Sequence, residues 1–520
     1  MSGAGAAMRR AIVHVRHRPW TGIALAAVYL YCFPYFSTLK HANELPRILT
    51  TEQLAEGRGF RLDERLDDLG SRADISTTPS GHSYQNKAPG LSMAAVPLYY
   101  PLRLVFERAG RRPPMMLVTW VVRVALATLP TLWFLGYFHR TAHRFADSDE
   151  ARNGALAAYA LGSMALPLSL LFMSHALAAS LAGVAFAVSV ATVRDHAHAE
   201  LAAALAVGAL LGLAMLVEYQ VVFAVPLIGG YLWWGARRRT RTALGIALGT
   251  VPFLAVLAWY QWSAFGSPLR TGYAYSVDPA NRLGIMGMVG FSERSFAQLF
   301  VHPDNGLLLL SPWVVLSVIG AVRIASRAEL RARVGPEASV AALIAIVYCA
   351  FVALLVPEFG RGGWSIGPRY LAVAMPFIAW LAAAGLDVCL GHDALRVPAL
   401  GLVLAGVGIH VLAATTYPHW PVEFENPIFE VSVRALREGH APHSVGTAIG
   451  LRGVASVAPL YVGVLALMFR MLTPSRRYVL EVSLACVVAM AAVLSYRPLA
   501  STPTHVADRM WRFVSGTFEP

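Results

Sequence analysis

Runs of about twenty predominantly apolar residues recur along the chain from Trp20 to Tyr496, with short polar segments between them. A helix needs about twenty such residues to cross the hydrocarbon core of a bilayer. A helix of a soluble protein keeps one face polar for contact with water, and this many wholly apolar runs exceed what a soluble fold needs. The pattern therefore predicts an all-α integral membrane protein, a polytopic helical bundle.

The apolar runs predict about thirteen crossings within a single domain over residues 1–497, followed by an external tail at 498–520. The basic region before the first run, with no small-residue cleavage site after it, predicts an uncleaved first helix. The expected spans are residues 20–39, 114–137, 151–171, 173–193, 199–216, 218–234, 243–265, 306–325, 338–356, 370–390, 395–415, 454–472 and 477–497.

The segment 89–106 is long enough to span, but Pro97 and Pro101 interrupt it. If it spans, every later helix inverts and the arginine-rich stretch 237–241 lies outside. If it lies in the interface, most arginine clusters at the ends of later helices fall in the cytoplasm, as the positive-inside rule requires. We therefore expect an interfacial helix here, within a first external loop at 40–113, and a later external loop at 416–453.

Composition argues against a nucleic-acid partner and against a cysteine-based metal site or disulfide framework. The residues are 56% hydrophobic and 14% charged, and the net charge of +13 comes from arginines that gather at the ends of the apolar runs. We read this charge as membrane topology, so no nucleic-acid partner is expected. The four cysteines lie far apart inside apolar runs and form neither a metal-binding spacing nor a disulfide framework.

The first external loop carries two polar stretches of interest. In TTEQLAEGRGF we expect a helix capped by Thr50 or Thr51 and stopped at Gly57. Further on, SGHSYQNKAPG contains Lys87, one of only two lysines in the chain. A compact ammonium suits a phosphate contact, although a lysine in a surface loop is the simpler alternative.

Several ionisable residues are expected at the same outer edge of the bundle although they belong to different segments. A charge near hydrocarbon is costly, so such groups mark functional sites, although each also has an ordinary role as a cap, turn or anchor. Carboxylates beside strong cations suit a phosphate-bearing substrate attacked by a hydroxyl group. These residues are Glu44, Asp74, Lys87, His175, Glu218, Glu358, Arg361 and Arg369.

No cofactor is expected. The Gly-rich run before Arg369 lacks the GK[ST] ending of a phosphate-binding P-loop. No His or Cys cluster has a metal-binding spacing, so no metal site is predicted, and a divalent cation (Mg²⁺ or Mn²⁺) held by carboxylates stays open.

The stretch NELPRILTTEQLAEGRGF followed by SGHSYQNKAPGLS resembles the first external loop of the lipid-dependent membrane glycosyltransferases of the GT-C fold, in the protein O-mannosyltransferase and lipid A aminoarabinose transferase group. The Asp-Glu pair of that group corresponds to Asn43-Glu44, and its Tyr-x-x-Lys-x-Pro stretch to Tyr84, Lys87 and Pro89. The resemblance implies that Glu44 is the catalytic base and that Lys87 contacts the lipid phosphate. GPRYLAVAMPF (367–377) resembles a late helix of the group and implies Arg369 as a second phosphate contact.

The chain departs from the pattern at two positions. Asn43 cannot act as a base, so this role is left to Glu44 or Asp74, and His175 stands where the group has an aspartate in its second external loop. The other substrate-binding candidates are Asn43, Tyr84, His175, Glu218, Tyr219, Arg361, Trp364 and Tyr370.

The expected function is transfer of a sugar from a polyprenyl-phosphate donor to an acceptor hydroxyl on a lipid, glycan or protein, with inversion at the anomeric carbon. The expected location is the bacterial inner membrane, among its lipids, with the site facing the extracytoplasmic side. A polymerase or ligase of lipid-linked glycans is the alternative among enzymes. A transporter or flippase is the alternative from another class, although the inverted repeats typical of many transporters are not visible.

Overall fold

A computed structural model describes residues 19–32, 41–195, 200–357, 363–473, 475 and 478–518. Apart from one small hairpin, its regular elements are helical. The α-helices are α2 Pro19–Leu30, α3 Glu44–Ala55, α4 Gly90–Glu107, α5 Met115–Arg123, α6 Leu129–Phe145, α7 Asp149–Ala160, α8 Ala165–Ser169, α9 Ser174–Arg194, α10 Glu200–Val217, α11 Val225–Gly235, α12 Arg239–Phe265, α13 Glu293–Val301, α14 Leu307–Leu310, α15 Val315–Ser326, α16 Ala328–Leu354, α18 Met375–Leu390, α19 Asp393–Ala414, α20 Arg434–Arg437, α21 Val445–Ala448, α22 Val454–Leu472, α23 Val479–Ser495 and α24 Thr504–Ser515. Short 3₁₀ or π segments are η1 Asp63–Asp68, η2 Val124–Thr128, η3 Tyr219–Phe223, η4 Gly272–Tyr275, η5 Pro279–Arg282, η6 Pro312–Val314, η7 Arg369–Leu371, η8 Ile428–Val433 and η10 Arg497–Leu499.

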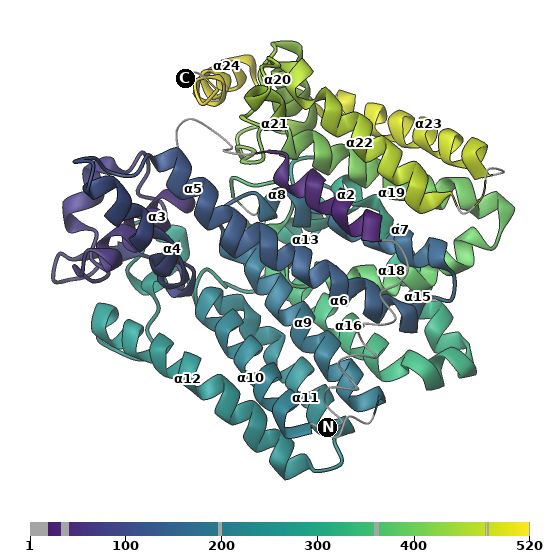
Figure 1. Cartoon of the computed structure of the whole chain (residues 1–520), viewed down its shortest axis with the longest axis horizontal. Coiled ribbons are helices and arrows are strands. Elements are labelled where there is room, and N and C mark those ends of the chain that lie inside the picture. The colour runs from purple at the N-terminus through teal and green to yellow at the C-terminus, as the bar shows by residue number, and fades with distance from the viewer. Residues whose placement is uncertain are drawn as a thin grey trace.

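Eight helices in the described part of the chain are long and apolar enough to cross a membrane. The first of them is continuous from α5 through the π segment η2 to α6. Figure 1 shows α10 and α12 on one flank of the bundle and α22 and α23 on the other, with α9 between them. The helices α9 and α18 are buried on nearly every side. These observations confirm the predicted all-α membrane architecture.

The predicted count of about thirteen spans is not confirmed. The eight helices correspond to the predictions at 114–137, 173–193, 199–216, 243–265, 338–356, 395–415, 454–472 and 477–497. Residues 151–171, predicted as one span, form α7 and the short α8, because the chain turns at Leu161–Met164. The predicted span 218–234 begins with the 3₁₀ segment η3, and its α-helix starts only at Val225, where Pro226 fixes the first turn. The three remaining predictions contain helices of 10–17 residues.

The first external loop differs from its prediction at two places. Its first helix, α3, starts at Glu44 instead of Thr50 or Thr51, and this earlier start places Asn43 and Arg47 one turn apart. The segment 89–106 is a helix, α4, packed on α3, and it is not among the eight candidate spans. The interfacial assignment of α4 agrees with this and stays a prediction.

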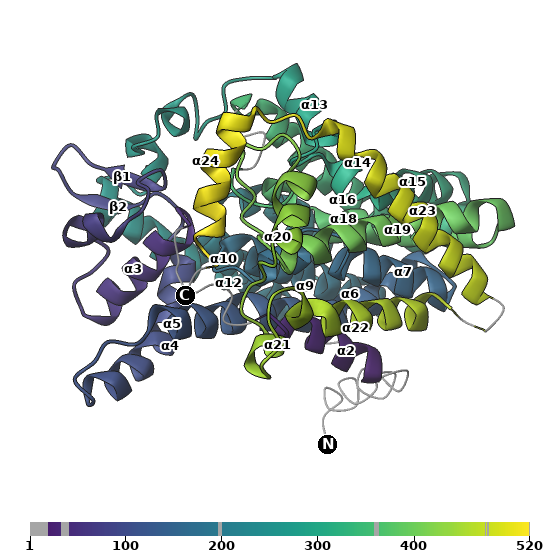
Figure 2. The same ribbon diagram turned by 90° about the horizontal axis from the view of Figure 1, so that it is seen from above.

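A two-stranded antiparallel hairpin, not predicted from the sequence, lies beside α3 (Figure 2). Strand β1 (Ile75–Thr77) pairs with β2 (Ser83–Gln85) with Ile75 opposite Gln85. Gly81 permits the turn because its φ is +83°. The hairpin brings together Asp74, which precedes β1, and Asn86, which follows β2. The Asn86 N–H donates to the Asp74 carbonyl at 3.0 Å.

The segment 498–520, expected as an external tail, folds back on the domain up to the last described residue, Phe518. Helix α24 lies against the loops around residues 364 and 440 (Figure 2). The Trp511 indole donates to Glu438 at 2.8 Å, and the Phe513 ring meets Trp364 edge-on at 5.3 Å.

Candidate functional site

The β1–β2 hairpin holds Asp74 against Lys87. The Lys87 ammonium lies 3.1 Å from Asp74 Oδ1 and donates to the Tyr273 hydroxyl at 3.1 Å. Burial opposes charge on both groups, but the neighbouring opposite charge outweighs it, so the pKa of Lys87 is raised and the pKa of Asp74 is lowered. Both side chains are therefore charged at neutral pH, and neither is a residue of an open surface loop.

Arg369 supplies a second cation to the same cluster. It is 7% exposed, and within the described part of the chain its guanidinium forms no side-chain hydrogen bond or ion pair; Nε is fully buried. The guanidinium lies over the Tyr370 ring at 5.6 Å. Gly363, at φ +65°, makes room for it, since a Cβ there would lie 3.0 Å from Arg369 Nη2. A buried cation without a counter-ion is costly, and an anionic ligand removes that cost.

Glu44, the expected base, is fully buried and held by Arg123. Two guanidinium nitrogens of Arg123 donate to the carboxylate at 2.6–2.9 Å, and the backbone N–H of Phe172 donates to it at 2.9 Å. His419 Nε2 lies 3.3 Å from the other oxygen. Both carboxylate oxygens accept hydrogen bonds, so Glu44 connects α3 to α5 and to the backbone just after α8.

A hydrogen-bonded chain connects Asp74 to Glu218. The amide nitrogen of Asn43 donates to Asp74 at 2.9 Å, and its oxygen accepts from Arg47 Nε at 3.2 Å. Arg47 donates onward to Ser174 at 3.1 Å, and Ser174 donates to Glu218 at 2.6 Å. Arg47 thus fixes the orientation of the Asn43 amide, so that its N–H group points at Asp74.

Two histidines stack beside this chain. The rings of His41 and His419 are 4.2 Å apart. Nδ1 of His41 accepts from the Asn43 N–H, so Nε2 carries the proton and donates to the Trp364 carbonyl at 2.9 Å. Burial, together with the nearby His419, lowers the pKa of His41 to about 3, and burial also lowers the pKa of His419. Both rings are neutral at physiological pH.

The other expected substrate-binding residues divide between the cluster and its surroundings. His175 Nδ1 lies 3.4 Å from Glu218, and the Tyr370 ring contacts both His175 and Arg369. The Tyr219 ring meets Tyr273 at 6.3 Å. Trp364 lies at the border of the cluster, and its ring packs against Phe513 of α24.

Tyr84 lies outside the charged cluster. Its ring is 5% exposed and packs edge-on against Phe265, in an aromatic group with Tyr260. In this structure Tyr84 packs within that aromatic group, and the expected substrate contact stays a prediction. Glu358 and Arg361 lie outside the described residues.

The charges of the cluster, which are buried or half-buried, do not balance. Arg47, Lys87, Arg123 and Arg369 are cations, and Glu44, Asp74 and Glu218 are the carboxylates among them, so the described cluster has one positive charge in excess. Arg47 and Arg369 have no direct carboxylate partner within the described residues. The cluster is therefore suited to bind an anion.

Sequence reasoning missed Arg47, Arg123, Tyr273, His41 and His419. Arg123 had a usable signal, because a charge in the middle of an apolar run requires a partner. Tyr273 and His419 had no such signal in the sequence, because they occupy long loops with ordinary composition.

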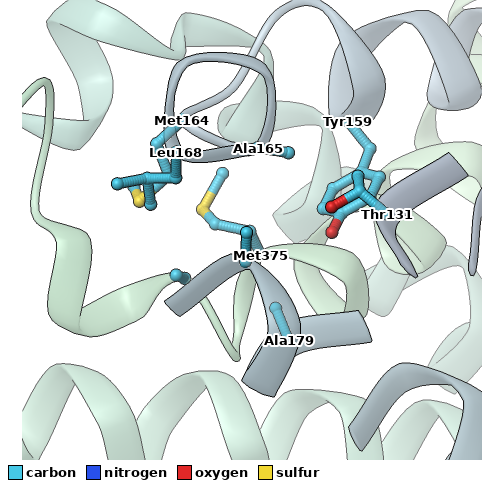
Figure 3. A pocket seen from close by; sticks show the side chains of 9 residues that line it. Thr131, Tyr159, Met164, Ala165, Leu168, Ala179 and Met375 are labelled. Carbon is cyan, nitrogen blue, oxygen red and sulfur yellow. The ribbon is translucent and has the colours of Figure 1, made fainter. Parts of the chain in front are cut away.

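No group of three or more His, Cys, Asp or Glu residues that could hold a metal ion occurs among the described residues. The cavity in Figure 3, lined by Thr131, Tyr159 and Met375 among others, has a volume of about 10 Å³. That is about the space of one water molecule, so the cavity is a packing gap of the core and not a substrate site.

Fold and site together define a polytopic helical membrane protein with a buried cationic cluster at one end of the bundle. No family model matches the chain, and a search of curated proteins found no match. Among solved structures, the chain is similar to ArnT from Cupriavidus metallidurans in the apo state, with a TM-score of 0.47 and 16% identity over 95% of this chain and 76% of that one. It is also similar to ArnT from the same organism bound to undecaprenyl phosphate, with a TM-score of 0.46, 15% identity and the same coverage.

Proposed function

We propose that the protein is a membrane glycosyltransferase that transfers a sugar from a polyprenyl-phosphate donor to an acceptor hydroxyl on the extracytoplasmic side. The observation that carries the proposal is the buried Arg369 guanidinium, which has no counter-ion among the described residues and shares a cluster with Lys87 and Asp74. The sequence resemblance of residues 43–92 supports the same function.

On the donor side, Lys87 and Arg369 bind the phosphate. A guanidinium and an ammonium form charge-assisted hydrogen bonds with phosphate oxygens. The phosphate gains negative charge as the sugar leaves, so these contacts strengthen in the transition state and accelerate the reaction.

On the acceptor side, Asp74 is the base that we favour over Glu44. Its carboxylate is held by one ammonium and one amide, whereas that of Glu44 is enclosed by Arg123 and a backbone N–H. Asp74 removes the proton of the acceptor hydroxyl, and the oxygen attacks the anomeric carbon. The bond from that carbon to the phosphate oxygen breaks, and the phosphate leaves with the electron pair. A single displacement inverts the anomeric configuration.

The test is binding of polyprenyl phosphate to the purified protein in nanodiscs, with transfer followed by mass spectrometry of lipids and glycans from a deletion strain. We expect saturable binding that Arg369→Gln weakens, and a missing sugar in the deletion strain. Binding unaffected by Arg369→Gln, together with unchanged glycans, would contradict the proposal. Accumulation of a lipid in one leaflet would instead indicate a flippase.

A further inference from the structure

A groove lies at the other, arginine-rich end of the bundle, between α11, α15 and α16. Its volume is about 770 Å³. Small residues line much of it, among them Gly230 on α11, Ala321 on α15 and Ala338 on α16. From Arg331 to Ala342 it follows α16 for about 16 Å at 1.5 Å per residue. It is long and mostly apolar, which suits a hydrocarbon chain.

Two residues mark the headgroup level at the mouth of the groove. Trp234 lines it and is 57% exposed, and tryptophan is enriched at membrane–water interfaces. Arg331 lines it as well and is exposed, and its Nη1 donates to the Ala325 carbonyl at 2.7 Å. The groove therefore passes from the interface into the apolar part of the bundle.

Arg331 combines two properties: it lines the groove, and it has no carboxylate partner within the described residues, whereas Arg327, which also has none there, does not line the groove. Arg194 pairs with the buried Glu337, Arg323 pairs with Asp387, and Arg333 pairs with Asp147. Arg331 has no carboxylate partner within the described residues, so a positive charge stands uncompensated where an apolar groove meets the interface.

We propose that this groove binds an anionic phospholipid, with the phosphate at Arg331 and an acyl chain along α16. The charge at its mouth favours an anionic over a zwitterionic headgroup, because an anionic lipid brings net negative charge to Arg331 and a zwitterionic lipid does not. The site is separate from the cationic cluster and does not depend on the proposed transfer reaction.

The test is native mass spectrometry of the full-length protein released from nanodiscs of equal parts phosphatidylglycerol and phosphatidylcholine. We expect preferential retention of phosphatidylglycerol, and a roughly ten-fold or greater loss of that retention in Arg331→Gln, the size of a charge-assisted contact. Arg470→Gln is the matched control, an exposed arginine at the end of α22 that does not line the groove.

A second variant keeps the test decisive if Arg331→Gln does not fold. Ser339 lines the groove and is exposed, so Ser339→Trp fills the groove without disturbing the core, and we expect it to reduce retention of the lipid. Equal loss in Arg331→Gln and Arg470→Gln would show only a general basic surface and overturn the proposal. Unchanged retention in Ser339→Trp would overturn it as well.

Discussion

Arg123, at the end of α5 in the first long apolar helix, holds the carboxylate of Glu44 through two nitrogens at 2.6–2.9 Å. This ion pair joins α3 to the bundle, because both partners are almost completely buried and 79 residues apart in sequence. This ion pair is the reason that we propose a positioning role for Glu44 and assign the base to Asp74.

Glu44→Gln should therefore destabilise the protein more than Asp74→Asn does. Glu44→Gln removes the carboxylate charge that the buried Arg123 guanidinium holds through two nitrogens, and breaking a buried ion pair typically costs about 3–5 kcal/mol. Thermal unfolding in detergent measures the difference. The double variant Glu44→Gln/Arg123→Gln should recover part of the lost stability. If Glu44→Gln is as stable as the wild type but has no turnover, Glu44 is the catalytic base.

Asp74→Asn should lower turnover by about 10²–10⁴-fold and leave polyprenyl phosphate binding in place, because Lys87 and Arg369 are intact. The measurements are transfer rate and donor affinity on the same preparation. Normal turnover in Asp74→Asn would exclude Asp74 as the base.

The pH profile tests the same residue. The folded-state pKa of Asp74 is lowered, so its ionised form persists below the usual carboxyl pKa of about 3.9. The stability that Asp74 contributes is present above that value and is lost as the pH falls through the lower folded-state pKa. We expect a transfer rate that is constant from neutral pH down to about pH 5, with no change attributable to Asp74 near neutrality. A decline centred near neutral pH would contradict Asp74 as the base.

Lys87→Ala should abolish transfer while the protein stays folded in membranes, and Lys87→Arg should restore little. The planar guanidinium does not reproduce a point charge held between Asp74 and Tyr273. Donor binding and thermal stability, measured together, separate a phosphate contact from a structural lysine. Full activity of Lys87→Ala would show that the lysine has no role in transfer.

Gly363→Ala should weaken donor binding through Arg369. The added Cβ would lie 3.0 Å from Arg369 Nη2. Gly110→Ala is the matched control, because Gly110 has nearly the same backbone angle, φ +66°, with no atom within 4 Å of an added Cβ. We expect a raised KM for the donor in Gly363→Ala alone. The same change in both variants would indicate backbone strain instead of displacement of Arg369.

Reporters fused within residues 40–88 and after Arg112 should appear on the same, external side of the membrane. This follows if α4 lies in the interface, and a cytoplasmic signal after Arg112 would show that α4 spans and invert every later helix.

The sequence predicted the membrane class and most long helices, because twenty-residue apolar runs are a strong and local signal. It could not predict the break at Leu161–Met164 or the short η3 segment, because both lie inside apolar runs and depend on packing with distant helices. It predicted that Glu44, Asp74, Lys87, His175, Glu218 and Arg369 share one end of the bundle, and the structure gathers them there.

Which of these residues touch one another was beyond the sequence. The contact of Asp74 with Lys87 depends on a hairpin only three residues long in each strand, too short for a periodic signal. The pairing of Glu44 with Arg123 depends on where α3 begins and on how it docks against a helix that follows much later in the chain.

The position of α24 in the chain determines when the region around the cationic cluster can be completed during biogenesis. Its Phe513 packs on Trp364, whose carbonyl accepts from His41, and Phe518 packs on Tyr417, next to His419. These contacts can form only after every spanning helix has been translated and inserted. A nascent chain stalled before α24 would have its cationic cluster in place but would lack the contacts of Phe513 and Phe518. We therefore expect protection of the 363–371 loop from protease to rise in a single late step of biogenesis.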